Sequence, residues 1–385
     1  MAFTLAPAEG KDFVNRQELL REMVETLSDR KTRMGFALYG RRRIGKTSVL
    51  LEAKRKLEKN GWVVPVYFSM WRLTENTIEE FSRLATAEIL EAYKERLSLK
   101  HRASDFLEAS VRELKRMLEE LKISVKLKGE LELVFQAAAR HEKREPALLL
   151  ESVLQVAENL AEETGTRCVL IIDEFPLVMK IKNGSRFGEQ IVKSLRTSYE
   201  TKKNVILCIA GSIRKTMEIA VLSSTSALYR QLIVREVAPL EEKHIKELME
   251  RNAERKFSEE EAKMVFGFCK GFPFYAQAIG KTLEKQKISR KAIGSAVERF
   301  LKEEGTILFM EELEKLPPKE KVVAKALSLS GPCFPSELEE KVGEKSSNTV
   351  KVLQYLEEKG VAEKTSEGRY DLEDPIFKLW LSKRE

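Results

Sequence analysis

Cysteine is scarce in this sequence of 385 residues, and long apolar runs are missing from it. No apolar run approaches the length of about 18 residues that a membrane-spanning helix needs, so we expect no membrane span. The start of the chain has neither a basic segment nor a long apolar stretch, so we expect no secretory signal. The four cysteines are far apart and lack metal-ligand spacing: Cys168, Cys208, Cys269 and Cys333. We therefore expect buried, reduced thiols in a cytoplasmic protein.

The sequence also has no internal repeat and no low-complexity tract. With 43% hydrophobic and 34% charged residues, it is expected to form a globular protein, and its length suits two or three domains.

The net charge of +7 raises the question of a nucleic-acid partner, so its location matters. Residues 31–60 hold ten Lys or Arg and two Glu, which is a local charge of +8. Residues 316–385 hold twelve basic and thirteen acidic residues and are close to neutral. The basic surplus therefore surrounds residues 40–47, and composition gives a C-terminal DNA-binding region little support.

Residues 40–47, Gly-Arg-Arg-Arg-Ile-Gly-Lys-Thr, match a pattern of two glycines with four residues between them, followed by Lys and Ser or Thr. In this pattern backbone N–H groups surround phosphate oxygens, Lys46 reaches the β- and γ-phosphates, and Thr47 offers a hydroxyl to Mg²⁺. An apolar run at 36–39 predicts a strand before the loop, and residues 47–59 predict an amphipathic helix after it. The residues expected to contact the nucleotide are Gly40, Arg41, Arg42, Arg43, Ile44, Gly45, Lys46, Thr47 and Ser48.

A continuous apolar strand from residue 167 ends in Asp173 and Glu174. Ligands bind at the carboxyl ends of parallel strands, so we expect Asp173 to hold Mg²⁺ directly or through water. Glu174 is expected to orient and polarise the attacking water. An acidic pair at a turn is the alternative interpretation, and the upstream loop favours the functional one. Ser212 ends another apolar strand. There we expect it to contact the attacking water or the γ-phosphate, to cap a helix at 213–219, or to do both.

Several arginines are candidates for the same site. The three arginines within the loop (Arg41, Arg42 and Arg43, the loop arginines) either are surface charges or pair with acids of residues 1–30 or with a partner. Arg214 and Arg230 follow the strand that ends at Ser212, and either could approach the γ-phosphate. Arg230 is favoured because it directly precedes a predicted strand.

Continuous apolar strands separated by helices predict a parallel sheet covered on both faces. The expected strands are 36–39, 62–70, 167–174, 205–212 and 232–237. The first expected helix follows a turn and ends at residue 27. The other expected helices are 47–59, 75–98, 103–122, 146–163 and 186–202. Residues 122–135 alternate apolar and polar around Gly129, which predicts a β-hairpin or two short strands within an insertion at 94–145.

Beyond Pro239 the pattern changes to consecutive helices, and Pro317-Pro318 marks a boundary. The expected helices are 241–255, 258–269, 273–285, 288–302 and 306–315. We therefore predict an α/β domain over 1–240, a helical lid domain over 241–315 and a third domain over 316–385.

The order of the motifs resembles the archaeal ATPase family of the signal-transduction (STAND) class of P-loop ATPases, which is related to the AAA+ and Orc1/Cdc6 type. The resemblance rests on residues 13–16 (Phe-Val-Asn-Arg), 40–48, 169–175, 210–212 (Ala-Gly-Ser) and 271–273 (Gly-Phe-Pro). It implies a P-loop NTPase fold that binds ATP or ADP with Mg²⁺.

The resemblance also implies residue roles. Phe13, Val14 and Arg16 would lie against the adenine, and Pro273 in the helical lid would pack near the base or ribose. A helix break with proline in the first turn is the ordinary interpretation of Pro273, and both can hold. The family often carries a Gly-Arg pair near the fifth strand, whereas Tyr229 precedes Arg230 here.

Residues 317–385 resemble a winged helix, with helices at 319–330, 335–342 and 346–359, a wing at 360–372 and a closing segment at 374–381. The third helix can enter a major groove, but Ser347, Asn348, Lys351 and Gln354 are a modest set of contacts for it. Winged helices also bind proteins, so double-stranded DNA and a protein both remain possible partners.

The leading hypothesis is an ATP-hydrolysing molecular switch that repositions the winged helix. A DNA-binding regulator or DNA-maintenance ATPase is the second hypothesis, and a nucleotide-binding scaffold with negligible turnover is the third. In the first, Lys46 and Mg²⁺ neutralise phosphate charge while Glu174, Ser212 and Arg230 are the candidate catalytic residues.

Overall fold

The fold is seen in a computed structural model of the chain. It describes residues 3–97, 103–108, 111–120, 123–139, 145–183, 185–186, 188–212, 217, 220–221, 226–253, 256–283, 289–343 and 346–384.

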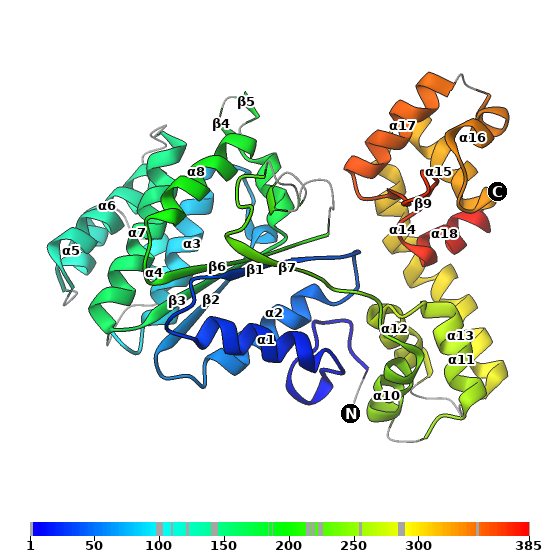
Figure 1. Ribbon diagram of the computed structural model, residues 1–385, viewed down its shortest axis with the longest axis horizontal. Coiled ribbons are helices and arrows are strands. Elements are labelled where there is room, and N and C mark those ends of the chain that lie inside the picture. Colours follow the sequence, from blue (N-terminus) through cyan, green and yellow to red (C-terminus); the bar gives the residue numbers. More distant parts are fainter. Residues whose placement is uncertain are drawn as a thin grey trace.

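A five-stranded parallel sheet lies at the centre of the N-terminal part (Figure 1). The strand order is β2-β3-β6-β1-β7. The strands are β1 (Gly35–Tyr39), β2 (Val63–Ser69), β3 (Arg167–Asp173), β6 (Val205–Gly211) and β7 (Leu232–Glu236). Every residue of β3 and β6 is buried, which explains why these strands are continuous apolar runs in the sequence. The predicted parallel sheet is confirmed.

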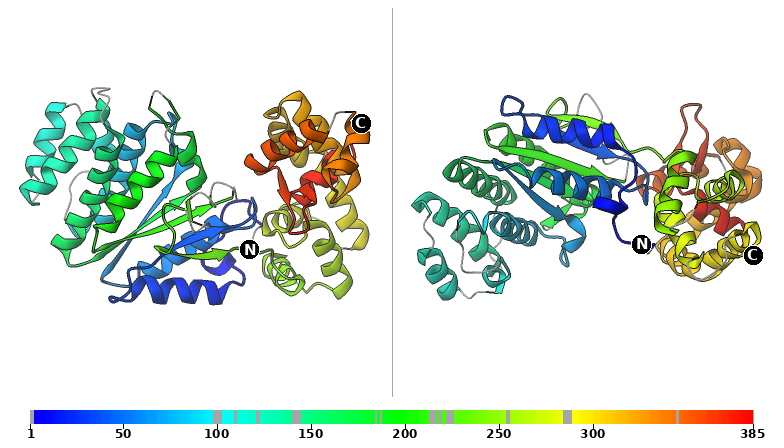
Figure 2. Two further views of the ribbon diagram at one scale, coloured as in Figure 1. Left: turned by 45° about the horizontal axis from the view of Figure 1, so that its top comes forward. Right: turned by 90° about the horizontal axis from the view of Figure 1, so that it is seen from below.

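Helices cover both faces of the sheet, because successive side chains of a strand point to opposite sides. Phe36 and Leu38 of β1 join the core under α1 (Gln17–Ser28) and α2 (Lys46–Leu57). Ala37 joins the core on the other face, which is covered by helices that are seen in Figures 1 and 2. These helices are α3 (Ile78–Tyr93), α7 (Pro146–Thr164) and α8 (Gly188–Glu200).

Between α3 and α7, the elements that the structure describes in the insertion are helices. They are α4 (Ala103–Glu108), α5 (Val111–Glu120) and α6 (Val125–Ala139). The predicted hairpin at 122–135 is therefore wrong. Leu127, Leu131 and Phe135 are buried at a spacing of four residues, so they form one face of a helix that packs on α3 and α7. Of the helix predicted over 103–122, residues 103–108 and 111–120 are helical, and residues 109–110 and 121–122 lie outside the described part.

Short elements connect the larger ones. They are η1 (Gly10–Asp12), η2 (Met70–Arg72), η3 (Phe175–Lys180) and an antiparallel pair, β4 (Lys182–Asn183) with β5 (Ser185–Arg186).

Five helices follow β7 and form what we call the helical unit: α10 (Glu242–Ala253), α11 (Glu259–Cys269), α12 (Pro273–Leu283), α13 (Arg290–Lys302) and α14 (Glu304–Glu314). The C-terminal unit comes next: α15 (Pro318–Ser330), α16 (Pro335–Val342), α17 (Ser346–Glu358), β8 (Ala362–Lys364), β9 (Tyr370–Leu372) and α18 (Pro375–Ser382). The predicted domain limits at 240 and 315 remain predictions.

The helical unit and the C-terminal unit share an aromatic core. The ring of Phe309 on α14 lies 5.5 Å from that of Phe377 and 5.6 Å from that of Trp380, both on α18. All three side chains are buried, so α14 and α18 are held together by apolar packing.

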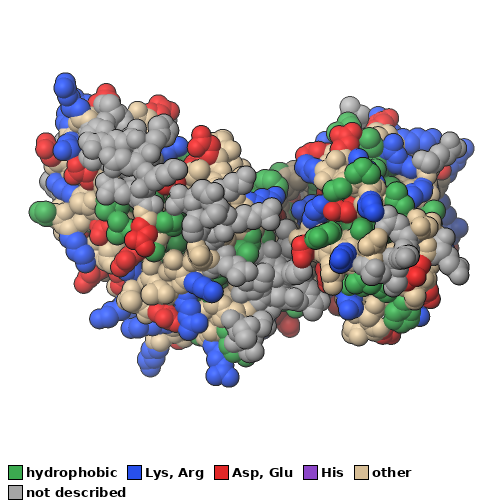
Figure 3. Space-filling view, turned by 90° about the horizontal axis from the view of Figure 1, so that it is seen from above, with side chains coloured by type: hydrophobic (Ala, Val, Ile, Leu, Met, Phe, Trp, Pro, Cys, Tyr) green, Lys and Arg blue, Asp and Glu red, His purple; other side chains and the backbone are tan. Residues whose placement is uncertain are grey.

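The surface mixes charges of both signs. On the face shown in Figure 3, basic side chains (blue) and acidic side chains (red) occur at both ends of the molecule. All four cysteines are buried and free, as predicted. None of the helices in the described part of the chain has the length and apolar character to span a bilayer.

Candidate active site

The parallel strands bring the predicted site residues to one edge of the sheet. Tyr39 at the end of β1 is in register with Gly211 at the end of β6, and Ser69 of β2 is in register with Asp173 of β3. The Gly40–Thr47 loop and the segments that begin at Glu174 and Ser212 therefore leave the sheet at the same edge.

The loop between β1 and α2 requires its two glycines. Gly40 has φ of 153°, and a Cβ there would lie 2.6 Å from the carbonyl oxygen of Val237. Gly45 has φ of 94°, and a Cβ there would lie 2.8 Å from a guanidinium nitrogen of Arg16. Ile44 between them is fully buried and anchors the loop in the core. The backbone path of the loop thus depends on residues without side chains at these two positions.

Lys46 begins α2 and is folded back onto the loop. Its ammonium donates to the carbonyl oxygens of Gly40 and Arg41, at 2.9 Å each, and the residue is only 5% exposed. Burial lowers the pKa of Lys46, and the nearby carboxylates of Glu174 and Asp173 oppose this. The lysine therefore lies where phosphate oxygens could replace the two carbonyl acceptors.

Asp173 is hydrogen bonded on both carboxylate oxygens. Thr47 Oγ1 donates to Oδ2 at 2.7 Å, and Tyr67 Oη donates to the same oxygen at 2.9 Å. The backbone N–H of Glu174 donates to Oδ1 at 2.9 Å. The structure thus brings together the two residues predicted to hold Mg²⁺, and hard oxygen ligands of this kind suit that ion.

Sequence reasoning missed Tyr67. Its strand was predicted, and parallel pairing puts the end of β2 beside the end of β3. The predicted pairing of these two strands could have identified Tyr67, because a tyrosine two residues before the end of one strand can reach the acid that ends the neighbouring strand.

Glu174 lies directly beyond β3 with a left-handed backbone, at φ of 52°. Such a conformation is uncommon for a residue with a side chain and is often stabilised at functional sites. Burial raises the pKa of Glu174, with Lys46 opposing and Asp173 adding to the shift. Ser212 Oγ donates to Glu174 Oε2 at 3.3 Å. The helix that Ser212 was predicted to cap lies largely outside the described residues, as does Arg214.

One interpretation of the sequence paired the loop arginines with acids of residues 1–30. In the structure their partners lie elsewhere. Arg43 donates to Glu312 Oε1 at 2.6 Å and to Asp374 Oδ2 at 2.7 Å. Arg42 lies 3.7 Å from Glu312, and Arg41 pairs with Glu363. Their partners come from α14, β8 and the residue before α18, so the loop is tied by charge to the helical and C-terminal units.

The Arg43 interactions are shielded from water, since the side chains of Arg43 and Asp374 are each 13% exposed. Burial by itself lowers the pKa of Arg43, but the surrounding Tyr275, Glu312 and Asp374 raise it above the ordinary value. Tyr275 also donates its hydroxyl proton to Asp374. Removing one partner of such a shielded pair is costly, because the other charge is then left buried without compensation.

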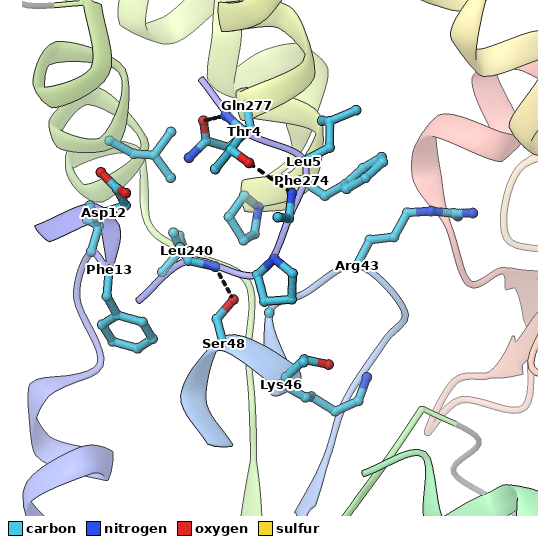
Figure 4. Close-up of a pocket in the computed structure, with 18 of the residues that line it drawn as sticks. Thr4, Leu5, Asp12, Phe13, Arg43, Lys46, Ser48, Leu240, Phe274 and Gln277 are labelled. Atoms are coloured by element: carbon cyan, nitrogen blue, oxygen red, sulfur yellow. Dashed lines mark hydrogen bonds between the residues drawn. The ribbon is translucent and has the colours of Figure 1, made fainter. Parts of the chain in front are cut away.

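A cavity of about 180 Å³ extends from the loop toward the helical unit (Figure 4). It is lined by predicted contacts from two distant segments, among them Phe13, Val14, Arg16 and Pro273. Gly45, Lys46, Thr47 and Ser48 line it from the loop side. The structure therefore places residues predicted to contact the phosphates beside residues for which the resemblance implies contact with the base or ribose.

The start of the chain also lines this cavity, which sequence reasoning missed. Residues 4–8 form part of its wall. The backbone N–H of Ala8 donates to Ser48 Oγ at 3.0 Å, and that of Thr4 donates to Gln277 Oε1 at 3.3 Å. No pattern in residues 4–8 by itself predicts this position.

Arg16 joins the loop to the segment after β7. Its guanidinium donates to the carbonyl oxygens of Ile44 at 2.5 Å, Gly45 at 3.3 Å and Ala238 at 3.2 Å. These acceptors are uncharged, and burial lowers the pKa of Arg16 to about 10. The result is a partly buried cation beside the cavity.

Arg230 is not brought to this edge. Its strand β7 begins at Leu232, which is in register with Gly35 at the start of β1. The length of a five-residue strand, roughly 16 Å, therefore separates Arg230 from the level of the loop. In the described structure its guanidinium lies over the ring of Tyr229, so a catalytic role for Arg230 within its own site lacks geometric support.

Known structures share this fold, and a family model matches the sequence. The parallel sheet with helices on both faces and a glycine-rich loop at its carboxyl edge is the α/β fold of P-loop NTPases. Residues 13–279 match the family described as "ATPase domain predominantly from Archaea", and the chain belongs to that family.

Two solved structures have similar folds over almost the whole chain. The Walker-type ATPase PABY2304 of Pyrococcus abyssi has a TM-score of 0.70 at 18% identity, covering 99% of each chain. The ORC2 protein of Aeropyrum pernix, in ADPNP-ADP complexes, has a TM-score of 0.56 at 13% identity, covering 95% of this chain and 91% of that one.

A curated relative is the uncharacterized protein MJECL04 of Methanocaldococcus jannaschii, 31% identical over 228 residues. The match covers 55% of this chain and 48% of that protein, so the chain spans about half the length of this relative.

Proposed function

We propose that this protein is an ATP-binding and ATP-hydrolysing molecular switch whose nucleotide state is coupled to the C-terminal unit, a winged helix. The observation that carries the proposal is the set of ion pairs between the loop arginines and the acids Glu312, Glu363 and Asp374. These pairs join the predicted phosphate-binding loop to the parts of the chain that would move.

The phosphate contacts follow from Lys46 and the loop. The lysine ammonium, now on the carbonyl oxygens of Gly40 and Arg41, would turn to the β- and γ-phosphates. The backbone N–H groups at the start of α2 add the positive end of the helix dipole. Binding would thus be driven mainly by charge in a cavity that excludes much of the water.

Thr47 and Asp173 would hold Mg²⁺, since their oxygens already lie 2.7 Å apart. When bound, Mg²⁺ supplies positive charge that neutralises the phosphate oxygens. Tyr67 and the backbone N–H of Glu174 would keep the Asp173 carboxylate in place.

Glu174 would orient the attacking water. Its raised pKa brings the carboxylate nearer to the value that suits a general base, and the hydrogen bond from Ser212 holds its orientation. Ser212 is therefore proposed to act through Glu174, with the γ-phosphate contact as a further possibility for the nucleotide-bound state.

Coupling follows from competition for the loop arginines. Phosphate oxygens are strong acceptors for arginine, so a bound nucleotide would compete with Glu312, Glu363 and Asp374. Loss of these pairs would free the C-terminal unit from the loop, whereas release of nucleotide would restore them. A ligand can shift such an equilibrium only by its difference in affinity for the two states, and here that difference arises at the arginines.

The test measures hydrolysis and movement separately. Single-turnover hydrolysis is compared between the wild type, Lys46→Ala and Glu174→Gln; we expect loss of binding in the first variant and retained binding without hydrolysis in the second. Flat traces for all three proteins, with tight ATP binding by the wild type, would instead identify a scaffold with negligible turnover.

Movement is measured by energy transfer between dyes at Lys193→Cys on α8 and Gln354→Cys on α17, which are exposed positions. The native cysteines are buried, so labelling is selective. ATP should change the transfer efficiency in the wild type, and Asp374→Asn should shift the nucleotide-free value in the same direction. Asparagine keeps the cap on Ile376 and Phe377 but removes the charge that pairs with Arg43. Equal transfer with and without saturating ATP would refute the coupling.

DNA binding by the C-terminal unit is the second candidate. Its support is the exposed face of α17, where Asn348, Lys351 and Gln354 are all solvent accessible. The prediction is duplex affinity that falls steeply with salt and is reduced by Lys351→Ala. Affinity that is unchanged by that substitution would leave a protein as the partner to seek.

A further inference from the structure

Gln277 on α12 lines the cavity and has one unused end. The residue is 5% exposed. Its Oε1 accepts a hydrogen bond from the backbone N–H of Thr4 at 3.3 Å. No described residue accepts a hydrogen bond from its Nε2, and Figure 4 shows the side chain among the cavity residues.

The bond to Thr4 determines which way the amide points. A backbone N–H can only donate, so the carbonyl oxygen of Gln277 must face Thr4 and the NH₂ group must face away from it. Gln277 itself therefore presents donors, and no acceptor, to the cavity. This donor faces the cavity and has no acceptor in the described part of the chain, so a ligand atom that accepts from it gains a hydrogen bond at that point.

The position of Gln277 indicates which part of a nucleotide it meets. In Figure 4 Gln277 and Lys46 lie at opposite ends of the cavity. The lining of the cavity also includes Phe13, Leu240 and Pro273, whose apolar surfaces suit a flat base. With phosphates at Lys46, the end at Gln277 receives the edge of the base that is farthest from the ribose, which is the Watson–Crick edge of a purine.

We propose that Gln277 is the specificity-determining residue for the base, and that its Nε2 donates to N1 of adenine. This inference rests on the proposed binding of ATP at the same site. Adenine carries a lone pair at N1, whereas guanine carries a hydrogen there. A guanine in the same orientation would set its N1–H against the NH₂ group of Gln277, which leaves two buried donors facing each other.

The test removes the hydrogen bond from either side. Affinities are measured by competition against a fluorescent ATP that is labelled on the ribose, so that its base is unmodified. The competitors are ATP, 1-deaza-ATP, which has a C–H group in place of N1, and GTP. For the wild type we expect 1-deaza-ATP to bind roughly tenfold more weakly than ATP, and GTP more weakly still.

Two variants then assign the effect to Gln277. Gln277→Leu should bind ATP and 1-deaza-ATP equally. Gln277→Glu keeps an acceptor for Thr4 and loses the donors, so it should favour inosine triphosphate, which carries a hydrogen at N1, relative to ATP. Gln190→Glu, at an exposed position on α8, is the matched control and should retain the wild-type order.

The outcomes separate the inference from the function on which it rests. If the wild type binds ATP but does not distinguish it from 1-deaza-ATP, or if the preference survives in Gln277→Leu, the role of Gln277 is refuted while the ATP site stands. If the wild type binds no ATP, both fail. The comparison of the two nucleotides on the wild type needs no variant to fold.

Discussion

Replacing Glu373 with glutamine should stabilise the protein in alkaline solution and have little effect in acid. Glu373 lies between β9 and α18, next to the loop arginines. Burial raises the pKa of Glu373 to about 8 from its ordinary 4.5, and Glu363 adds to the shift, while Lys46, Arg41 and Arg42 oppose it. The folded protein therefore keeps a proton here that the unfolded chain has released.

The sign of the effect follows from this difference in proton binding. The unfolded chain loses the proton near pH 4.5, whereas the folded protein loses it near pH 8. Between these values the folded state binds more protons, so the stability of the wild type falls as the pH rises and levels off above pH 8. Glutamine does not titrate, so the variant lacks this loss.

The size of the stability change comes from the difference between the pKa of Glu373 in the folded protein and its pKa in the unfolded chain. Each pKa unit corresponds to about 1.4 kcal/mol, so the full shift would be worth roughly 5 kcal/mol. Part of the Glu373 surface still touches solvent, so we expect about 2 to 3 kcal/mol at pH 9. This should raise the unfolding midpoint of Glu373→Gln over the wild type by several degrees.

The assay is thermal unfolding of both proteins at several values between pH 4.5 and pH 9. Fluorescence of the buried Trp380 on α18 reports on the C-terminal unit. The difference in midpoint should be smallest at pH 4.5, grow to about pH 8 and then stay constant. Glu314→Gln, an exposed position on α14, is the control and should show no such trend. A difference that is the same at pH 5 and pH 9, or a less stable Glu373→Gln at pH 9, would refute the reasoning.

Three further substitutions test contacts around the loop. Gly280→Ala should displace Phe3, because a Cβ would lie 2.0 Å from its ring, and should expose the start of the chain to limited proteolysis. Tyr67→Phe removes a donor to Asp173 and should cost about 1 kcal/mol in a denaturant titration; an unchanged midpoint would show that this hydrogen bond contributes nothing. Arg16→Lys replaces the planar guanidinium, whose two terminal nitrogens reach three carbonyl oxygens, with a single ammonium group. It should therefore lower stability by about 1 to 3 kcal/mol in the same assay, whereas an Arg-to-Lys exchange at an exposed surface position should have little effect.

The sheet could be predicted because four of its five strands, β1, β2, β3 and β6, are buried along most of their length. Strands such as β3 and β6 need apolar residues at every position, and this makes them visible as continuous runs. The insertion could not be predicted as well. Alternation around Gly129 favoured a hairpin, but the burial of Leu127, Leu131 and Phe135 on α3 and α7 favours a helix. A short segment can fit the apolar alternation of a strand and the apolar period of a helix almost equally well, so tertiary packing decided between them.

The candidate site divides in the same way. The loop, Asp173 and Glu174 are local motifs, each contained in a few residues that follow a strand. Tyr67 and Gln277 were missed because their roles depend on neighbours that are far away in the sequence, and neither residue type marks a site by itself.

By itself, the sequence determined the parallel sheet, the glycine-rich loop and the acidic strand end, because each depends on interactions within a short segment or on burial of a whole strand. Only the tertiary structure decided what the loop arginines contact. Their partners Glu312, Glu363 and Asp374 lie about 270 to 330 residues further along the chain. Charge is plentiful throughout this sequence, so composition cannot select among the possible pairs. The packing of α14 and α18 against each other places Glu312 and Asp374 beside Arg43, where the pair of Arg43 with Asp374 is shielded from water. Glu363 reaches Arg41 from β8.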